Sequence, residues 1–125
     1  MEKILLFQSE AVAQVKAIAA PLKIRVEAVK PEFFSATIGE LAAGLPAKNA
    51  LEGKSEKNQT DSLLVFCEVE DQKVDVILQK LRQKEISITY KAVMTDSNKK
   101  WNVHRMYLEM EAERHAFEQQ MKNQQ

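Results

Sequence analysis

Ile4-Leu5-Leu6-Phe7 and Leu63-Leu64-Val65-Phe66-Cys67 are two short apolar runs, one near the start of the chain and one in its second half. A short run without polar positions is typical of a strand that is buried on both faces of a sheet. The two runs therefore predict two central strands, with the rest of the chain arranged around them.

Each run begins a unit of the same plan: a strand, an amphipathic helix, an alternating strand and a further helix. With an offset of 59, Leu5, Leu6, Phe7, Val15, Ile18 and Leu22 fall on Leu64, Val65, Phe66, Val74, Ile77 and Leu81. Five extra residues in the second helix then bring Ile24, Ala28 and Val29 onto Ile88, Ala92 and Val93. We predict one domain over residues 1–125 with a pseudo-repeat of 3–45 and 62–121, either two similar structural units or a duplication.

The two units are joined by a polar stretch over residues 47–61. It is dominated by Lys, Glu, Asn, Gln and Ser, so it offers little surface to bury. We predict a flexible surface linker there, and the sequence leaves open whether it orders on binding.

Two apolar strands and two alternating ones predict a four-stranded sheet with strands 1 and 3 in the middle. The first interpretation is an α+β, ferredoxin-like sheet of two β-α-β units, with two helices on one face and the other face partly free. It adds a short helix capped by Ser35 and a long C-terminal helix over about residues 99–119, and Asp71 is the expected N-cap of the amphipathic helix in the second unit. The alternative is a small doubly wound sheet, all parallel, in the order 2-1-3-4, which the short helix after strand 2 would permit.

The charge balance limits the classes of partner. Eighteen basic and eighteen acidic residues cancel, so the field expected of a general nucleic-acid or membrane-surface binder is absent. The single cysteine fits a reducing compartment. The apolar run at residues 4–7 is short and lacks a cleavage-site pattern, so we expect no signal peptide, and without a run of about 18 apolar residues we expect no transmembrane span. We expect a cytoplasmic protein that does not bind membranes, with nucleic acid an unfavoured partner.

The first candidate site is a polar cluster before the last helix. If the helix began there, its free backbone amides together with nearby lysines would hold a phosphate or carboxylate. The simpler interpretation is that Ser97 or Asn98 caps the helix and Trp101 packs on the sheet. The candidate ligand-binding residues are Thr95, Ser97, Asn98, Lys99, Lys100 and Trp101.

The same stretch carries a resemblance. Ala92, Thr95, Asn98 and Trp101 stand at the spacing A-x-x-T-x-x-N-x-x-W, and an acidic helix follows. In this respect about half of the chain resembles a family of uncharacterised small bacterial proteins, known as a domain of unknown function. The resemblance implies no activity, substrate or catalytic residue, and Asp96-Ser97 stands where the family often has a proline.

Cysteine and histidine do not combine into a catalytic motif. Cys67 lies at the carboxyl end of a buried strand, beside Glu68 and Glu70, whose charges disfavour a reactive thiolate, so we expect a buried, inert thiol. Glu111 and His115 are four apart on the last helix, and with His104 they supply too few ligands for a durable zinc site. We predict no catalytic residues, no metal and no cofactor, and an enzyme is less favoured than a binding protein.

The last helix carries an incomplete apolar stripe that includes Met106, Met110, Phe117 and Met121. The stripe either covers one face of the sheet or reaches a protein partner or a second copy of the chain. The leading hypothesis is therefore a non-enzymatic interaction or regulatory module that forms a homo-oligomer or binds a protein. The alternative is a small-anion or nucleotide sensor that binds at residues 95–100.

Overall fold

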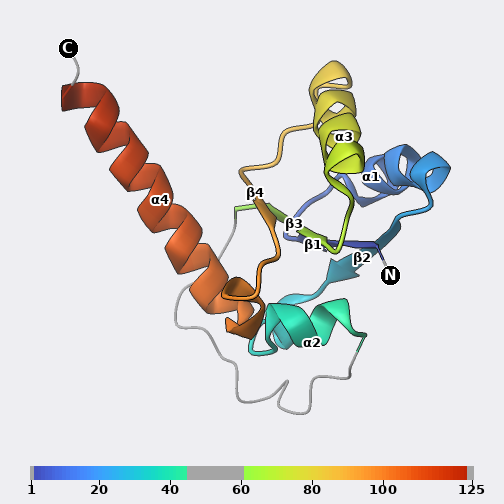
Figure 1. Cartoon of the computed structure of the whole chain (residues 1–125), viewed down its shortest axis with the longest axis horizontal. Helices are drawn as coiled ribbons and strands as arrows, with labels where there is room; N and C mark the ends of the chain where they lie inside the picture. Colours follow the sequence, from blue (N-terminus) through green and yellow to red (C-terminus); the bar gives the residue numbers. More distant parts are fainter. Residues whose placement is uncertain (1, 45–60, 124–125) are drawn as a thin grey trace.

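The computed structural model describes residues 2–44 and 61–123, with side chains described as far as Glu118. Figure 1 shows a sheet with helices on both faces and one helix, α4, that leaves the body. The strands and helices in chain order are β1 (Lys3–Phe7), α1 (Val12–Ala19), β2 (Arg25–Val29), α2 (Ile38–Ala42), β3 (Leu63–Cys67), α3 (Asp71–Gln83), β4 (Tyr90–Val93) and α4 (Val103–Asn123). Short 3₁₀ turns lie at Ala20–Leu22, Pro31–Phe33 and Asn98–Lys100. The predicted linker, apart from Asp61, lies outside the described residues.

The sheet has the order β2-β1-β3-β4, which confirms the α+β prediction with strands 1 and 3 central. Each β-α-β unit contributes two adjacent parallel strands, and the units meet where β1 pairs antiparallel with β3. In a ferredoxin-like sheet the two strands of a unit are split by another strand. Here the two strands of each unit are adjacent, so the sheet is not ferredoxin-like in its strand order. The all-parallel alternative gave the correct order, 2-1-3-4, but the wrong direction for the β1–β3 pair.

The pairing register corrects the alignment of the two units. Leu5 lies opposite Val65, and both side chains belong to the same core cluster, whereas Leu64 belongs to the cluster on the other face. An offset of 59 therefore matches side chains on opposite faces, whereas an offset of 60 aligns β1 (Lys3–Phe7) with β3 (Leu63–Cys67) and keeps each side chain on its own face. A shift of one residue moves every side chain of a strand to the opposite face, and an apolar run buried on both faces gives no sign of the error.

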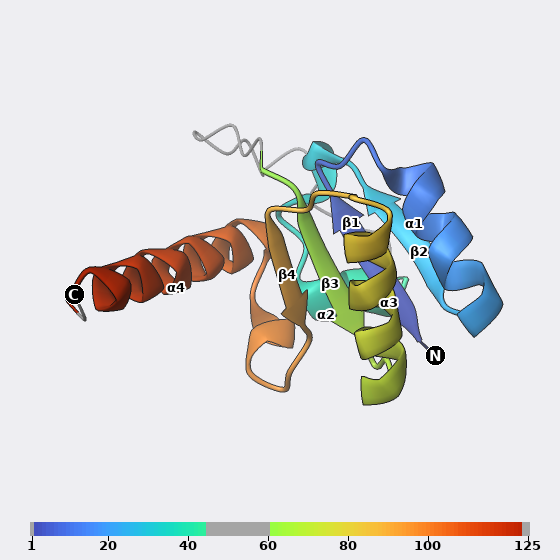
Figure 2. The same cartoon turned by 90° about the horizontal axis from the view of Figure 1, so that it is seen from above.

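Both faces of the sheet are covered (Figure 2). Helices α1 and α3 pack on one face through residues such as Val15, Ile18, Ile77 and Leu81. The opposite face holds the second core cluster, which includes Phe34 near the 3₁₀ turn before α2, Ile38 and Leu41 of α2, and Val103, Met106 and Tyr107 of α4. The expectation that this second face is partly free is wrong for the two central strands, because these elements bury it.

The ends of α1 and α3 explain why each unit turns back into a strand. Lys23 and Glu85 follow the two helices in the left-handed region, with φ of 60° and 56°. The next amide donates back into the helix, from Ile24 to the carbonyl of Ala19 at 3.3 Å and from Ile86 to that of Leu81 at 2.9 Å. These are Schellman-type endings, which satisfy carbonyls that the last helical turn leaves free.

Three helix starts differ from the sequence-based expectation. The cap of α2 is Thr37 rather than Ser35: its hydroxyl accepts from the Glu40 amide at 3.1 Å, and the Glu40 carboxylate accepts from the Thr37 amide at 2.9 Å. Asp71 is the first residue of α3 and not its cap. The third difference, at α4, determines the candidate site and is described below.

Candidate functional site

The turn after β4 is held by its own side chains. The Thr95 amide donates to Oδ1 of Asn98 at 2.7 Å, and the Asn98 amide donates to the Thr95 hydroxyl at 3.1 Å. The side-chain amide of Asn98 also donates to the carbonyl of Val93, at the end of β4. The hydroxyl and the amide that would contact a ligand are thus already used to close this turn.

Helix α4 starts at Val103 rather than at residue 99. Asn102 precedes it and accepts from the Arg105 amide at 2.8 Å, as a helix cap does. Asn98–Lys100 forms only a 3₁₀ turn, without a side-chain cap. Free amides of an α-helix therefore do not lie at Lys99 and Lys100, where the anion site was predicted.

The other residues of the predicted site connect three elements. Trp101 is half-buried against the core, its carbonyl accepts from the Ile38 amide of α2 at 2.9 Å, and the guanidinium of Arg105 lies 4.9 Å from its ring centroid. Lys99 pairs with Asp96 at 3.4 Å, while Ser97 and Lys100 are exposed. The structure thus brings the predicted residues into one compact segment, whose contacts join β4, α2 and α4.

A glycine allows α2 to approach this segment. A Cβ atom on Gly39 would lie 3.0 Å from the backbone carbonyl oxygen of Lys99. Real Cβ atoms rarely come so close to backbone, so Gly39 is required by contact rather than by its dihedral angles. Sequence reasoning treated Gly39 only as part of a short helix.

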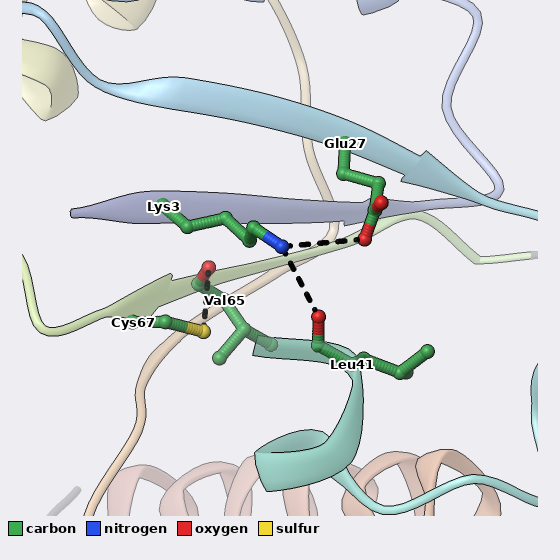
Figure 3. Close-up of polar contacts among 5 residues, drawn as sticks. All are labelled: Lys3, Glu27, Leu41, Val65 and Cys67. Atoms are coloured by element: carbon green, nitrogen blue, oxygen red, sulfur yellow. Dashed lines mark hydrogen bonds and ion pairs between the residues drawn. The ribbon is translucent and has the colours of Figure 1, made fainter. Parts of the chain in front are cut away.

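A buried polar cluster lies at the start of β1, on the face covered by α2 (Figure 3). Lys3 is 5% exposed; its ammonium donates to the carbonyl of Leu41 at 3.3 Å and lies 3.7 Å from a carboxylate oxygen of Glu27. Leu41 is in the last turn of α2, so Lys3 places a positive charge at the negative end of that helix. This arrangement gives Lys3 partners for burial, and sequence reasoning did not single it out.

Cys67 lies opposite Lys3 across the β1–β3 pair. It is 1% exposed, and burial raises the pKa of its thiol to about 12, with the positive charge of Lys3 acting in the opposite direction. Its sulfur contacts the carbonyl of Val65 at 3.9 Å. The thiol is sealed and protonated at neutral pH, which agrees with the predicted inert cysteine and leaves no thiolate for nucleophilic chemistry.

The two histidines lie in different surroundings. His115 is exposed and pairs loosely with Glu111 at 3.9 Å, as its spacing predicts. His104 packs edge-on to Phe34, with ring centroids 5.9 Å apart, and neither ring nitrogen has a hydrogen-bond partner among the described residues. Over residues 2–44 and 61–123, His, Cys, Asp and Glu side chains form no group of three that would hold a metal ion.

A shallow hollow of about 710 Å³ lies between the start of α1 and the end of α3, at the carboxyl end of β1. Its lining includes the hydroxyls of Ser9 and Ser62, which already accept from the amides of Ala11 and Thr89. Its charged groups are Glu10, Asp61, Glu85 and Lys84. Three carboxylates against one ammonium disfavour an anion, although a helix begins there.

The apolar stripe of α4 divides into a buried and an exposed part. Met106 is 1% exposed and belongs to the core, so its assignment to an interaction surface is wrong; Met110 is half-buried against the same core. Phe117 is 63% exposed, and residues 112–118 are all exposed. Both views show this half of α4 projecting from the body (Figures 1 and 2). The side chain of Met121 lies outside the described residues.

The fold is that of a small α+β domain built from two β-α-β units, and a family model matches the second unit. Residues 62–117, from just before β3 to Phe117, match the model of a family described as a domain of unknown function (DUF3783). No curated protein and no solved structure matches the chain. The second half is thus similar to an uncharacterised domain family, and the site must be judged from its geometry. Within the described part of the chain, every helix is too short or too polar to cross a membrane.

Proposed function

We propose that this protein is a small, non-enzymatic interaction or regulatory module of the cytoplasm and that it binds a protein partner through the distal half of α4. The observation that carries the proposal is Phe117. Val103, Met106 and Met110 place one face of α4 on the core, and Phe117, seven residues beyond Met110, continues that face outside the body at 63% exposure. An aromatic side chain on such a face is a common anchor in protein interfaces.

The way α4 is held in the fold is a second argument for a protein partner. Tertiary contacts hold its proximal half, and Tyr107 donates to the carbonyl of Asp61 at 2.7 Å. Farther along, the Arg114 side chain bonds to Tyr90 of β4 and pairs with Glu118 at 3.3 Å, and exposed i,i+4 pairs of the second kind contribute about 0.3–0.5 kcal/mol each. Because isolated helices shorter than about 12–15 residues are marginal in water, packing against a partner would stabilise the distal half.

The non-enzymatic part of the proposal is supported by how the reactive groups are used. The Cys67 thiol is buried and protonated, His115 lies on the projecting helix, and the Thr95 hydroxyl is engaged in its turn. Catalysis by general acid–base or nucleophilic groups needs several of them to converge on one space. The lone buried cysteine also fits a reducing compartment.

Photocrosslinking in living cells tests the proposal. A photoreactive phenylalanine analogue replaces Phe117 in one variant and Leu108 in a control; Leu108 is also an exposed apolar residue of α4, at 50%. The two positions are nine residues apart, which at about 3.6 residues per turn places them on opposite faces of the helix. We expect a defined protein adduct from position 117 and none from 108. Absence of an adduct from position 117 would count against the proposal.

A further inference from the structure

We infer that the occupant of the Phe117 face is the same face of a second copy of this chain, so that two α4 helices pair about a two-fold axis. This inference rests on the proposed function and specifies its partner. The pairing face consists of Met110, Arg114 and Phe117, flanked by Glu113 and Glu118.

The charges of this face are self-complementary. An interface between identical copies must carry both partners of each contact in one patch, because the same surface is used twice. Arg114 lies on the apolar stripe between Met110 and Phe117. Within one chain its guanidinium pairs with Glu118, one turn later, at 3.3 Å and bonds to Tyr90, so pairing of two copies would exchange these contacts for contacts with the other copy. In an antiparallel pair, Arg114 of each copy approaches the Phe117–Glu118 region of the other, where it meets an aromatic ring and a carboxylate.

The positions of the other exposed apolar residues favour the same face. Among the described residues, the large apolar side chains that are exposed are Val76, Val93, Leu108 and Phe117. Val76 is on α3, Val93 is at the end of β4, and Leu108 is on the opposite side of α4. Phe117 is the most exposed of the four and the one in line with a face that already packs on protein.

The available area sets the expected strength. The segment after Met110 is 13 residues long, about 20 Å at roughly 1.5 Å per residue. One face of such a segment is smaller than the roughly 800 Å² per partner of a standard stable interface. We therefore expect a weak pair that forms and dissociates with concentration rather than a permanent dimer.

Sedimentation equilibrium of the full chain tests the inference from about 10 µM to about 1 mM, the range in which small interfaces associate. We expect the average mass to rise from that of the 14.3 kDa chain toward twice that mass. Phe117→Ser should weaken the association by about tenfold or more, whereas the matched control Leu108→Ser should leave it unchanged. A monomer at every concentration, or equal effects of the two variants, would overturn the inference.

Charge exchange gives a second measurement that does not depend on Phe117. Arg114→Glu makes positions 114 and 118 both acidic, and Glu118→Arg makes them both basic. Each variant alone should associate more weakly than the native chain, and their equimolar mixture should regain association, because every 114–118 contact between the two is then a pair of opposite charges. No regain in the mixture would contradict this pairing.

The two experiments separate the inference from the proposed function. An adduct at position 117 that contains a different protein, with a chain that sediments as a monomer, overturns the second-copy inference and leaves the interaction module standing. A monomer without any adduct overturns both.

Discussion

Glu2 and Lys3 are neighbours in the chain, and each one holds the end of a different helix on opposite faces of the sheet. The Glu2 carboxylate accepts from the Glu70 amide at 2.9 Å, at the start of α3, and also pairs with Lys73. The Lys3 ammonium donates to the carbonyl of Leu41 at the end of α2. A negative charge at a helix start and a positive charge at a helix end both match the helix dipole. These adjacent residues therefore fasten one helix to each face of β1.

Replacing Lys3 tests its role at the end of α2. Lys3→Met keeps most of the aliphatic stem but removes the charged donor to Leu41 and the ion pair with Glu27, while the Leu41 carbonyl keeps the bond from the Gly44 amide at 3.1 Å. We expect the free energy of unfolding in urea to fall by about 1–2 kcal/mol, because a buried hydrogen bond from a charged donor is lost. Lys16→Met, at an exposed position of α1, is the control and should change it by less than about 0.5 kcal/mol. Equal stability of the two variants would show that Lys3 does not fasten α2.

Glu2 should make stability depend on pH. The hydrogen bond from the Glu70 amide and the bond to Lys73 hold the pKa of Glu2 below its usual value of 4.5. The native state therefore prefers the carboxylate. Its contribution is complete above the pKa of the unfolded chain and is lost as the pH falls through the lower, folded pKa.

The measurement compares native protein with Glu2→Gln by thermal unfolding at several pH values. The native chain should be the more stable near pH 7, and the difference should shrink in acid, once the carboxylate is protonated. Glu10→Gln, at an exposed residue before α1, serves as control and should not show this convergence. A difference that stays constant down to the lowest pH would argue against the Glu2 cap.

The local sequence pattern was sufficient to predict the strands and the central position of β1 and β3. The apolar runs of β1 and β3 and the helical spacing of Ile77 and Leu81 in α3 depend on neighbours within a few residues, so the four strands and the central pair were predicted correctly. The antiparallel direction of the β1–β3 pair was not predicted, because an apolar run buried on both faces looks the same in a parallel and an antiparallel sheet.

Capping by distant residues was also beyond local pattern. The start of α3 is satisfied by Glu2, 68 residues earlier, and the end of α2 by Lys3, 38 residues earlier. At residues 95–102 several side chains compete as caps, and Asn102 rather than Ser97 or Asn98 caps α4. The candidate anion site required the free amides at the start of α4, and their position depends on which residue caps the helix. The site could therefore not be located without the structure.

Gly39 offers a test of the contact between α2 and the 95–101 segment. At an open helical position, glycine to alanine stabilises by about 1 kcal/mol. Because the new Cβ would lie 3.0 Å from the Lys99 carbonyl oxygen, we expect Gly39→Ala to lose this gain and be neutral or destabilising. Gly39→Val, which adds bulk at the same point, should be clearly less stable in urea unfolding. Stabilisation by Gly39→Ala of about 1 kcal/mol would mean that the contact is loose.

Asn98 distinguishes a structural turn from a ligand site. Its side chain accepts from Thr95 and donates to Val93, so Asn98→Ala removes two hydrogen bonds at the end of β4. We expect the free energy of unfolding to fall by about 1–2 kcal/mol, with each partly exposed bond contributing about 0.5–1 kcal/mol. Ser97→Ala is the matched control, because Ser97 is exposed and its side chain does not cap the turn.

The same pair of variants tests the sensor hypothesis. If Thr95 and Asn98 only close the turn, Asn98→Ala lowers the melting temperature. Added phosphate then changes the melting temperature by the same small amount in the native chain and in both variants. If these residues bind an anion instead, phosphate stabilises the native chain and Ser97→Ala or Lys100→Glu reduces that effect. Since the Thr95 hydroxyl and the Asn98 side chain already bond to each other's backbone, a ligand would have to break those bonds before it could bind there. We therefore expect the first outcome.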